Sequence, residues 1–267
     1  MKQRPLENQI CVGNFIKNVM KTFRLIRSHP GGAAYNMALD AKIFSRYLED
    51  GVPVFRLYSW QSPSFTYGFS QEPRNQIDLV ACATDGVEVA KRITGGGVLF
   101  HDDEITYSFV CSKSDLAEPQ GVFVDYRNIC KFLMRFYASL GLEPKFALEA
   151  ESFNNRCVPH ELCSAAHEKY DIVIGAKKIG GNAQKRNRQA VFQHGSVPCR
   201  INWNFMRKYL KFFPENLSAS VTTLVDELKV VPEKDILEQK LINAFSSVFD
   251  VKFTEEDQVL YETSMVE

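Results

Sequence analysis

KRITGGGVLFHDDEITYSFV, which spans residues 91–110, places three consecutive glycines between a Lys-Arg pair and a His-Asp pair. Glycine weakens a strand or a helix because it loses much backbone entropy and packs no side chain. Three glycines in a row instead allow positive φ and let a ligand approach backbone N–H groups, which can form an anion-binding nest. An ordinary flexible turn is the alternative. Residues 87–93 and the residues from 98 onward have strand patterns, so the stretch predicts a tight strand–loop–strand unit.

Patterning along the rest of the chain predicts both helices and strands. Apolar residues recur with helical spacing at 33–48, 122–140, 204–213 and 234–249. Segments typical of strands occur at 54–60, 64–69, 170–174, 177–179 and 190–196. We therefore expect an α+β fold in which helices cover a mixed, largely antiparallel sheet. Residues 1–22 are expected to form an N-terminal extension and residues 231–267 a small helical C-terminal part.

The charge balance argues against two large classes of binding protein. The chain has 32 basic and 32 acidic residues, whereas nucleic-acid and anionic-membrane binders need a net basic surface. No apolar run approaches the ~18 residues that a membrane span needs, and the N-terminal residues have no signal-peptide pattern. The seven cysteines include no C-x-x-C pair and no zinc-ligand spacing. We therefore expect reduced thiols, no metal site and a cytoplasmic protein.

A second glycine pair lies in KKIGGNAQ, residues 177–184. The ammonium of Lys178, beside the N–H groups of a glycine turn, is suited to a carboxylate or carbonyl oxygen. A solvated hairpin rim is the alternative. Cys163 is a candidate nucleophile, because His160 and His167 lie near it in the sequence and cationic neighbours lower the pKa of a thiol. The alternative there is a buried, unreactive thiol.

Several blocks together resemble the lipoate–protein ligase and octanoyltransferase superfamily, the relatives of biotin ligases. Residues 91–102 resemble its R-R-x-x-G-G-[GR]-x-V-x-H-D block, and residues 177–184 resemble its [KR]-K-[IV]-x-G-S-A-Q block. Further matches are QHGSV at 193–197, AYNMALD at 34–40 and SASVTTL at 218–224. The blocks keep the family's order, so the resemblance implies a biotin/lipoate ligase-like catalytic, acyl-binding domain over residues 23–230.

The resemblance also implies a tunnel between the two glycine loops for a C8 acyl chain and its carbonyl. Lys178 would hold the carbonyl oxygen, and in a transferase Cys163 would carry the acyl group as a thioester. The implied acyl- or adenylate-binding residues are Arg92, Thr94, Gly95, Gly96, Gly97, His101, Gly180, Gly181, Asn182, Ala183, His194 and Gly195.

Two mechanisms remain open within this resemblance. Cys163 stands seven residues before Tyr170, and residues 102–108 read DDEITYS; both features resemble the transferases. Gly97, however, occupies a position where many transferases have Arg and the ligases have Gly. A transferase would need no cofactor and would take its acyl group from acyl carrier protein. A ligase would need ATP and Mg²⁺ and would not need Cys163.

The implied partners are the same for both mechanisms. They are lipoyl domains of 2-oxoacid dehydrogenase complexes or the glycine cleavage H protein, with no nucleic acid and no membrane. A non-catalytic subunit that binds a lipoyl carrier is a third interpretation. Lys178 and His101 are both present, which argues against such a degenerate protein.

Overall fold

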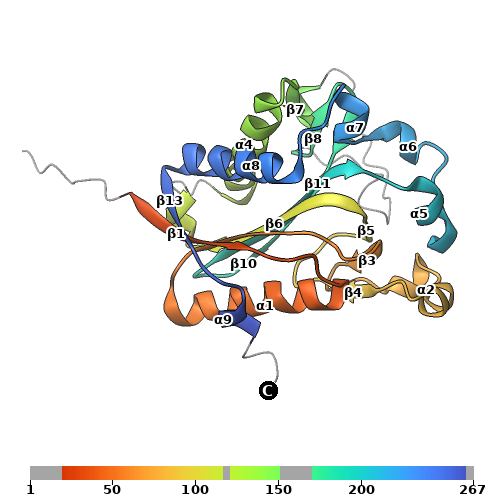
Figure 1. The fold of residues 1–267 in the computed structure, drawn as a ribbon, viewed down its shortest axis with the longest axis horizontal. Coiled ribbons are helices and arrows are strands. Elements are labelled where there is room, and N and C mark those ends of the chain that lie inside the picture. The colour runs from red at the N-terminus through yellow and green to blue at the C-terminus, as the bar shows by residue number, and fades with distance from the viewer. Residues whose placement is uncertain (1–19, 117–120, 151–169, 263–267) are drawn as a thin grey trace, which may run out of the picture.

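The structure, a computed structural model, describes residues 20–116, 121–150 and 170–262, and Figure 1 shows how their elements are arranged. The strands are β1 (Lys21–Arg27), β2 (Val54–Tyr58), β3 (Ser64–Tyr67), β4 (Val89–Lys91), β5 (Leu99–His101), β6 (Asp103–Cys111), β7 (Pro144–Phe146), β8 (Ile172–Ile174), β9 (Lys177–Ile179), β10 (Gly181–Arg186), β11 (Val191–Arg200), β12 (Val221–Thr222) and β13 (Val251–Glu255).

The helices are α1 (Ala33–Asp50), α2 (Leu79–Asp85), α3 (Lys113–Leu116), α4 (Val122–Ser139), α5 (Trp203–Tyr209), α6 (Leu217–Ser220), α7 (Leu224–Glu227), α8 (Lys234–Phe249) and α9 (Val259–Glu262). Two short 3-10 turns, η1 (Pro73–Asn75) and η2 (Ala147–Glu149), complete the described elements. None of the helices in the described ranges is both long and apolar enough to cross a membrane.

A six-stranded sheet in the order β10-β11-β6-β2-β1-β13 forms the centre of the fold. The pairs β10–β11, β11–β6 and β6–β2 are antiparallel, whereas β1 runs parallel to both β2 and β13. Two smaller sheets have the orders β12-β9-β8-β7 and β4-β3-β5. The predicted α+β fold with a mixed, largely antiparallel sheet is therefore confirmed.

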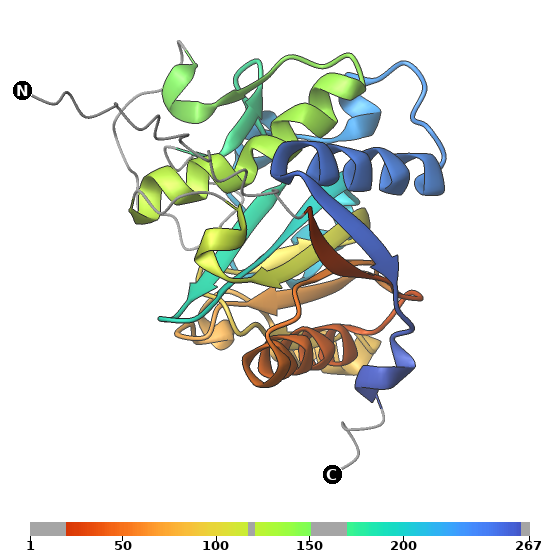
Figure 2. The same cartoon turned by 90° about the vertical axis from the view of Figure 1, so that its left-hand side faces the viewer.

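Helices cover both faces of the central sheet, with α4 and α8 on one face and α1 on the other (Figures 1 and 2). On the α4–α8 side, Phe55, Phe132 and Phe245 are fully buried. The ring of Phe245 lies 4.5 Å from that of Phe55 and 5.2 Å from that of Phe132, measured between centroids. Aromatic rings bury large apolar areas, so this contact ties both helices to the sheet that carries the site described below.

The predicted segments agree with the observed elements except in two places. The helices predicted at 33–48 and 234–249 appear as α1 and α8. The helix predicted at 204–213 ends earlier, since α5 stops at Tyr209. The two strands beside the glycine loop are not neighbours, because β3 lies between them and pairs with both β4 and β5. The loop therefore connects strands on opposite sides of β3 and is not a tight hairpin.

The C-terminal part of the chain contributes to the same sheet and core. Leu237, Leu241 and Phe245 of α8 belong to the main apolar cluster, and β13 pairs with β1. At the other end β1 already begins at Lys21. The division of the chain at residues 22 and 230 remains a prediction.

Candidate functional site

The guanidinium of Arg92 organises the glycine loop. Arg92 is 2% exposed, and its Nη2 donates to the carbonyl oxygens of Gly95 (3.1 Å) and Gly97 (2.8 Å). Its Nη1 donates to Thr66 Oγ1 on β3 at 2.9 Å. The resemblance implies that Arg92 binds the acyl group or adenylate. In the structure its Nη1 and Nη2 atoms donate within the protein, so the role that Arg92 shows is to shape the loop.

A positive φ in the loop and a close backbone approach beside it explain two of the glycines here. Gly96 has a φ of +93°, which is unfavourable for residues with a side chain. A Cβ atom on Gly68, just after β3, would lie 2.1 Å from the carbonyl oxygen of Gly96. The loop thus packs directly against the backbone that follows β3, and two of the glycines have structural reasons to be there.

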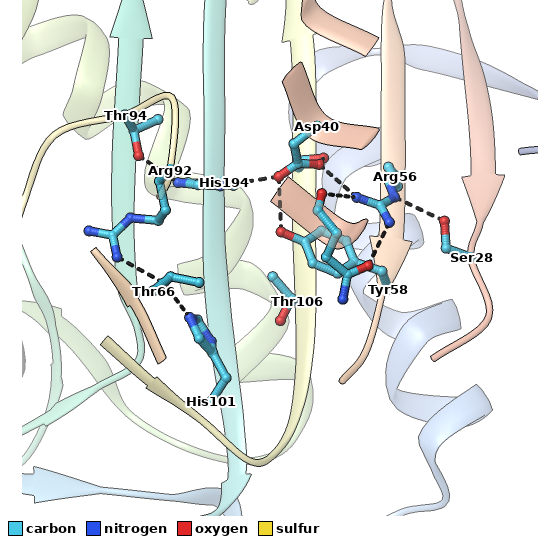
Figure 3. A network of polar contacts seen from close by, with 12 residues as sticks. Ser28, Asp40, Arg56, Tyr58, Thr66, Arg92, Thr94, His101, Thr106 and His194 are labelled. Atoms are coloured by element: carbon cyan, nitrogen blue, oxygen red, sulfur yellow. Dashed lines mark hydrogen bonds and ion pairs between the residues drawn. The ribbon is translucent and has the colours of Figure 1, made fainter. Parts of the chain in front are cut away.

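A buried carboxylate–histidine–threonine chain holds one side of the loop (Figure 3). Burial lowers the pKa of His194, although its hydrogen bond to Asp40 opposes this change. The neutral ring can donate from Nδ1 to Asp40 Oδ2 at 3.2 Å and accept the Thr94 hydroxyl at Nε2 at 2.7 Å. Thr94 belongs to the glycine loop and Asp40 to α1, so the chain links the loop to the helix.

A second chain of the same kind reaches the loop from β5. His101 Nδ1 lies 2.9 Å from Glu104 Oε1, and its Nε2 lies 2.6 Å from the hydroxyl of Thr66, which is also the hydroxyl that accepts from Arg92. Trp60 stacks on the His101 ring at a centroid distance of 3.8 Å and donates to Glu104 at 2.8 Å. The ring of His101 is therefore held on its face and at both nitrogens.

Asp40 is the centre of a larger buried network. It accepts hydrogen bonds from Arg56 Nη1 (2.8 Å), Ser108 Oγ (2.8 Å) and the Tyr58 hydroxyl (3.0 Å), and Arg56 is fully buried. Burial is the largest influence on the pKa of Asp40 and raises it. The hydrogen bonds from His194 and Ser108 and the charge of Arg56 outweigh burial, so the pKa of Asp40 is lowered.

The second glycine pair lies at the end of β9. Lys178 Nζ is 2.7 Å from Asp171 Oδ2, and each side chain is 7% exposed. Gly180 has a φ of +72°, and a Cβ there would lie 2.2 Å from the carbonyl oxygen of Ser196. The strands predicted at 170–174 and 177–179 form a hairpin, because β8 and β9 pair antiparallel. Lys178 is a buried, ion-paired cation and not part of a solvated rim.

The Asn182 side chain has a structural partner. Its Oδ1 accepts from the Tyr107 hydroxyl at 2.7 Å. A Cβ on the neighbouring Gly195 would lie 2.0 Å from that same Oδ1. Gly195 therefore leaves the space in which Asn182 reaches Tyr107.

Most of the predicted residues line one of two adjoining pockets. The histidine pocket encloses about 280 Å³ and is lined by Met37, Tyr58, Trp60, Arg92, Leu99, His101, Thr106, Gly181, Ala183, His194, Gly195 and Ser196. The lysine pocket encloses about 580 Å³, part of it open to solvent, and is lined by Leu99, Phe100, Asp102, Glu104, Lys178, Gly180, Gly181, Ser196, Pro198, Arg200, Ile201, Trp203, Met206 and Val221. Leu99, Gly181 and Ser196 line both, so the pockets meet beside Gly181.

Some predicted residues do not line either pocket. Thr94, Gly95, Gly96, Gly97 and Asn182 are absent from both linings and support the loops instead. Cys163 lies outside the described residues. No group of three His, Cys, Asp or Glu side chains within the described ranges is arranged to hold a metal ion.

Sequence analysis did not single out the buried partners of these residues. They are Asp40, Arg56, Trp60 and Asp171. One available signal was the placement of Asn36 and Asp40 four residues apart, on the helix face that also carries Ile43 and Tyr47. Polar residues on such a face need partners when they are buried.

The described cysteines are poor candidates for a nucleophile. Cys82, Cys111, Cys130 and Cys199 are all buried. Burial raises the pKa of Cys82 to about 11 and that of Cys199 to about 12. A thiol with so high a pKa supplies almost no thiolate near neutral pH.

Acidification should destabilise the fold through His194. Because burial lowers the pKa of His194 in the folded protein, the unfolded chain binds more protons below its ordinary value of about 6.5. The contribution of the neutral His194 ring to the free energy of unfolding is complete above that value. It is lost as the pH falls below it, by at most about 1.4 kcal/mol per pH unit. Urea unfolding at pH 7.5 and pH 5.5 measures the loss.

A pair of histidine variants isolates this contribution. His194→Gln should reduce the difference in the free energy of unfolding between pH 7.5 and pH 5.5. His29→Gln, at an exposed position, should leave that difference unchanged. An unaltered pH dependence in His194→Gln would contradict the prediction. Asp40 favours the protonated ring, and Arg92 and His101 oppose it.

Comparisons with known proteins identify relatives of this chain. A family model described as Lipoyl protein ligase A/B catalytic domain matches residues 32–248. An octanoyltransferase LipM from Kyrpidia tusciae is 35% identical over 196 residues, 72% of either chain. An octanoyltransferase LipM from Clostridioides difficile is 27% identical over 256 residues, 92% of this chain and 94% of the relative. A solved bipartite lipoate protein ligase with its E2 lipoyl domain from Thermoplasma acidophilum has the same fold, with a TM-score of 0.71 at 21% identity over 92% of each chain.

Proposed function

Since the chain belongs to the lipoyl protein ligase A/B catalytic-domain family, we propose that it transfers octanoyl groups to lysines of lipoyl domains. The observation that carries this proposal is the junction of the two pockets beside Gly181, with the buried ammonium of Lys178 in the lysine pocket. The similarity to octanoyltransferases LipM supports transfer over ligation. The solved relative that contains a lipoyl domain supports the class of acceptor.

The histidine pocket suits the octanoyl chain. Met37, Tyr58, Trp60 and Leu99 supply apolar or aromatic surface. Gly181 leaves room for a thin chain to lie against the backbone, because it has no side chain. Lys178 would then lie near the carbonyl, where its ammonium stabilises the negative charge that develops on the oxygen. Asp171, at 2.7 Å, would keep that ammonium in place.

The proposed chemistry consists of two displacements at the acyl carbonyl. The Cys163 thiolate attacks the donor thioester, and the donor thiolate leaves, so that the enzyme holds an octanoyl thioester. The neutral amine of the acceptor lysine then attacks this thioester, an amide bond forms, the amine loses a proton and the Cys163 thiolate leaves. No cofactor is needed, because a thioester is already activated.

An ATP-dependent lipoate–protein ligase is the alternative function. Gly97 favours it, since this position resembles the ligases in the glycine block. Such an enzyme would use ATP and Mg²⁺ to form an acyl-adenylate, which the acceptor lysine attacks directly.

One assay separates these functions. The purified protein is incubated with a lipoyl domain and either octanoyl-acyl carrier protein alone or ATP, Mg²⁺ and free lipoate, and the mass of each protein is measured. Modification by the carrier without ATP supports the proposal. Modification only with ATP and lipoate would establish the ligase, and modification with neither would favour a non-catalytic carrier-binding protein.

Gly181→Val tests the junction of the two pockets. A Cβ at this position would lie 3.9 Å from Leu99 Cδ2, an ordinary contact, and a strand accepts valine readily. The side chain should nevertheless fill space meant for the acyl group, and overpacking of about 1–3 kcal/mol corresponds to a loss of about 5- to 150-fold in octanoyl transfer. Gly181→Ala should have a smaller effect, and the melting temperature should stay near that of the parent. Normal transfer by a folded Gly181→Val protein would contradict this placement.

A further inference from the structure

The lysine pocket extends from the site of acyl transfer to the protein surface. Its lining includes the buried Lys178, the half-buried Gly181 and the exposed Arg200 at the end of β11. Between them most lining side chains are apolar, among them Phe100, Ile201 and Trp203. A long, thin ligand could therefore reach the acyl carbonyl from outside.

The surface at the outer end is strongly basic. Residues 200–213, RINWNFMRKYLKFF, contain four basic residues and no acidic residue, in a chain whose net charge is zero. Arg200, Arg207 and Lys211 are exposed, and Phe212 is 69% exposed. Lys208 differs from these residues, because Asp85 lies 2.7 Å from its ammonium.

Aromatic contacts connect this surface to the pocket. The guanidinium of Arg207 lies 4.4 Å from the ring centroid of Phe213, and the Phe213 ring lies 6.4 Å from that of Trp203, a lining residue. The carboxylates in the lining have other partners: Asp102 accepts from the Asn202 N–H, and Glu104 from Trp60 and Thr106. Arg200 has the exposed Asp103 as its cross-strand neighbour, whereas Arg207 and Lys211 add exposed positive charge in the segment that follows.

We propose that residues 200–213 dock an acidic acyl-carrier protein, whose thiol arm enters the lysine pocket and delivers the octanoyl thioester. This inference rests on the proposed function and locates the surface on which its donor docks. An acceptor lysine has only a four-carbon stem with which to reach into the pocket. A carrier arm is longer, and opposite charges on the two proteins steer their encounter.

Charge reversal at the entrance tests the docking surface. Arg200→Glu or Arg207→Glu should raise the KM for octanoyl-acyl carrier protein about 3- to 10-fold at low salt, with little change in kcat, because charges on the rim of an interface act mainly on association. High salt should reduce the difference. Lys252→Glu, an exposed position on β13 at the opposite edge of the sheet, makes the same change in charge and should leave this KM unchanged.

A donor without a carrier separates docking from chemistry. Octanoyl-pantetheine should react equally well with the parent and both arginine variants, and direct binding of octanoyl-acyl carrier protein should weaken in parallel with the rise in KM. Trp203→Ala should remove any preference of the parent for octanoyl-pantetheine over the shorter octanoyl-N-acetylcysteamine. Melting temperatures establish that each variant is folded.

The outcomes are distinguishable. An unchanged KM for the carrier, a raised KM for the lipoyl domain instead, or an equal loss with octanoyl-pantetheine would each overturn the docking proposal while leaving octanoyl transfer intact. A folded parent protein that transfers octanoyl from neither the carrier nor octanoyl-pantetheine would refute the proposed function and, with it, this inference.

Discussion

Lys178→Met is expected to lower octanoyl transfer about 10²- to 10³-fold, which is the usual effect of removing a group that stabilises developing negative charge on an acyl oxygen. Methionine keeps much of the length and the apolar stem of the side chain but has no ammonium. The rate of modification of a lipoyl domain, followed by mass spectrometry, measures the loss. The effect should fall mainly on kcat, because the charge develops during the reaction and is absent from the bound substrate.

The ion pair with Asp171 requires a control for this experiment. Lys178 and Asp171 are 2.7 Å apart and nearly buried, and loss of one member of such a pair typically destabilises a protein by about 3–5 kcal/mol. The double variant Lys178→Met/Asp171→Asn removes both charges and should recover stability but not activity. Near-normal transfer by either folded variant would refute the assignment of Lys178.

Cys163→Ala is expected to abolish turnover by the transferase and to remove the octanoyl adduct from the mass spectrum of the protein. A thioester intermediate needs a thiolate, and the neighbouring Ser164 has an alcohol that is a far poorer nucleophile near neutral pH. In a ligase the same variant should keep most of its ATP-dependent activity, since the adenylate is attacked directly by the acceptor lysine.

Cys157→Ala is the matched control, since this cysteine stands six residues earlier in the same segment outside the described residues. It should retain both the adduct and the activity. An adduct that disappears in Cys157→Ala and persists in Cys163→Ala would show that Cys157, and not Cys163, is the nucleophile. Among the described cysteines, burial raises the pKa of Cys82, Cys111, Cys130 and Cys199, so none of these four supplies a thiolate in its place near neutral pH.

Local sequence patterns were sufficient for most elements of the fold. The apolar spacing of residues 234–249 predicts a helix, and α8 occupies the same residues. The alternation on both sides of Gly175 predicts the hairpin of β8 and β9, and Gly175 has the positive φ that a tight turn favours. These features depend on residues close in sequence, so their periodicity and turn residues contain the necessary information.

By itself, the sequence determined the α+β class, the two glycine loops and the resemblance to an acyl-transfer family. The packed structure alone shows which charges are paired, that β3 separates β4 from β5, and that the two pockets meet beside Gly181. Asp40 and His194 are 154 residues apart in the chain, and Thr94 is 100 residues from His194. No local pattern encodes such contacts, because they form when strands distant in sequence pair and bury polar groups that must then find partners.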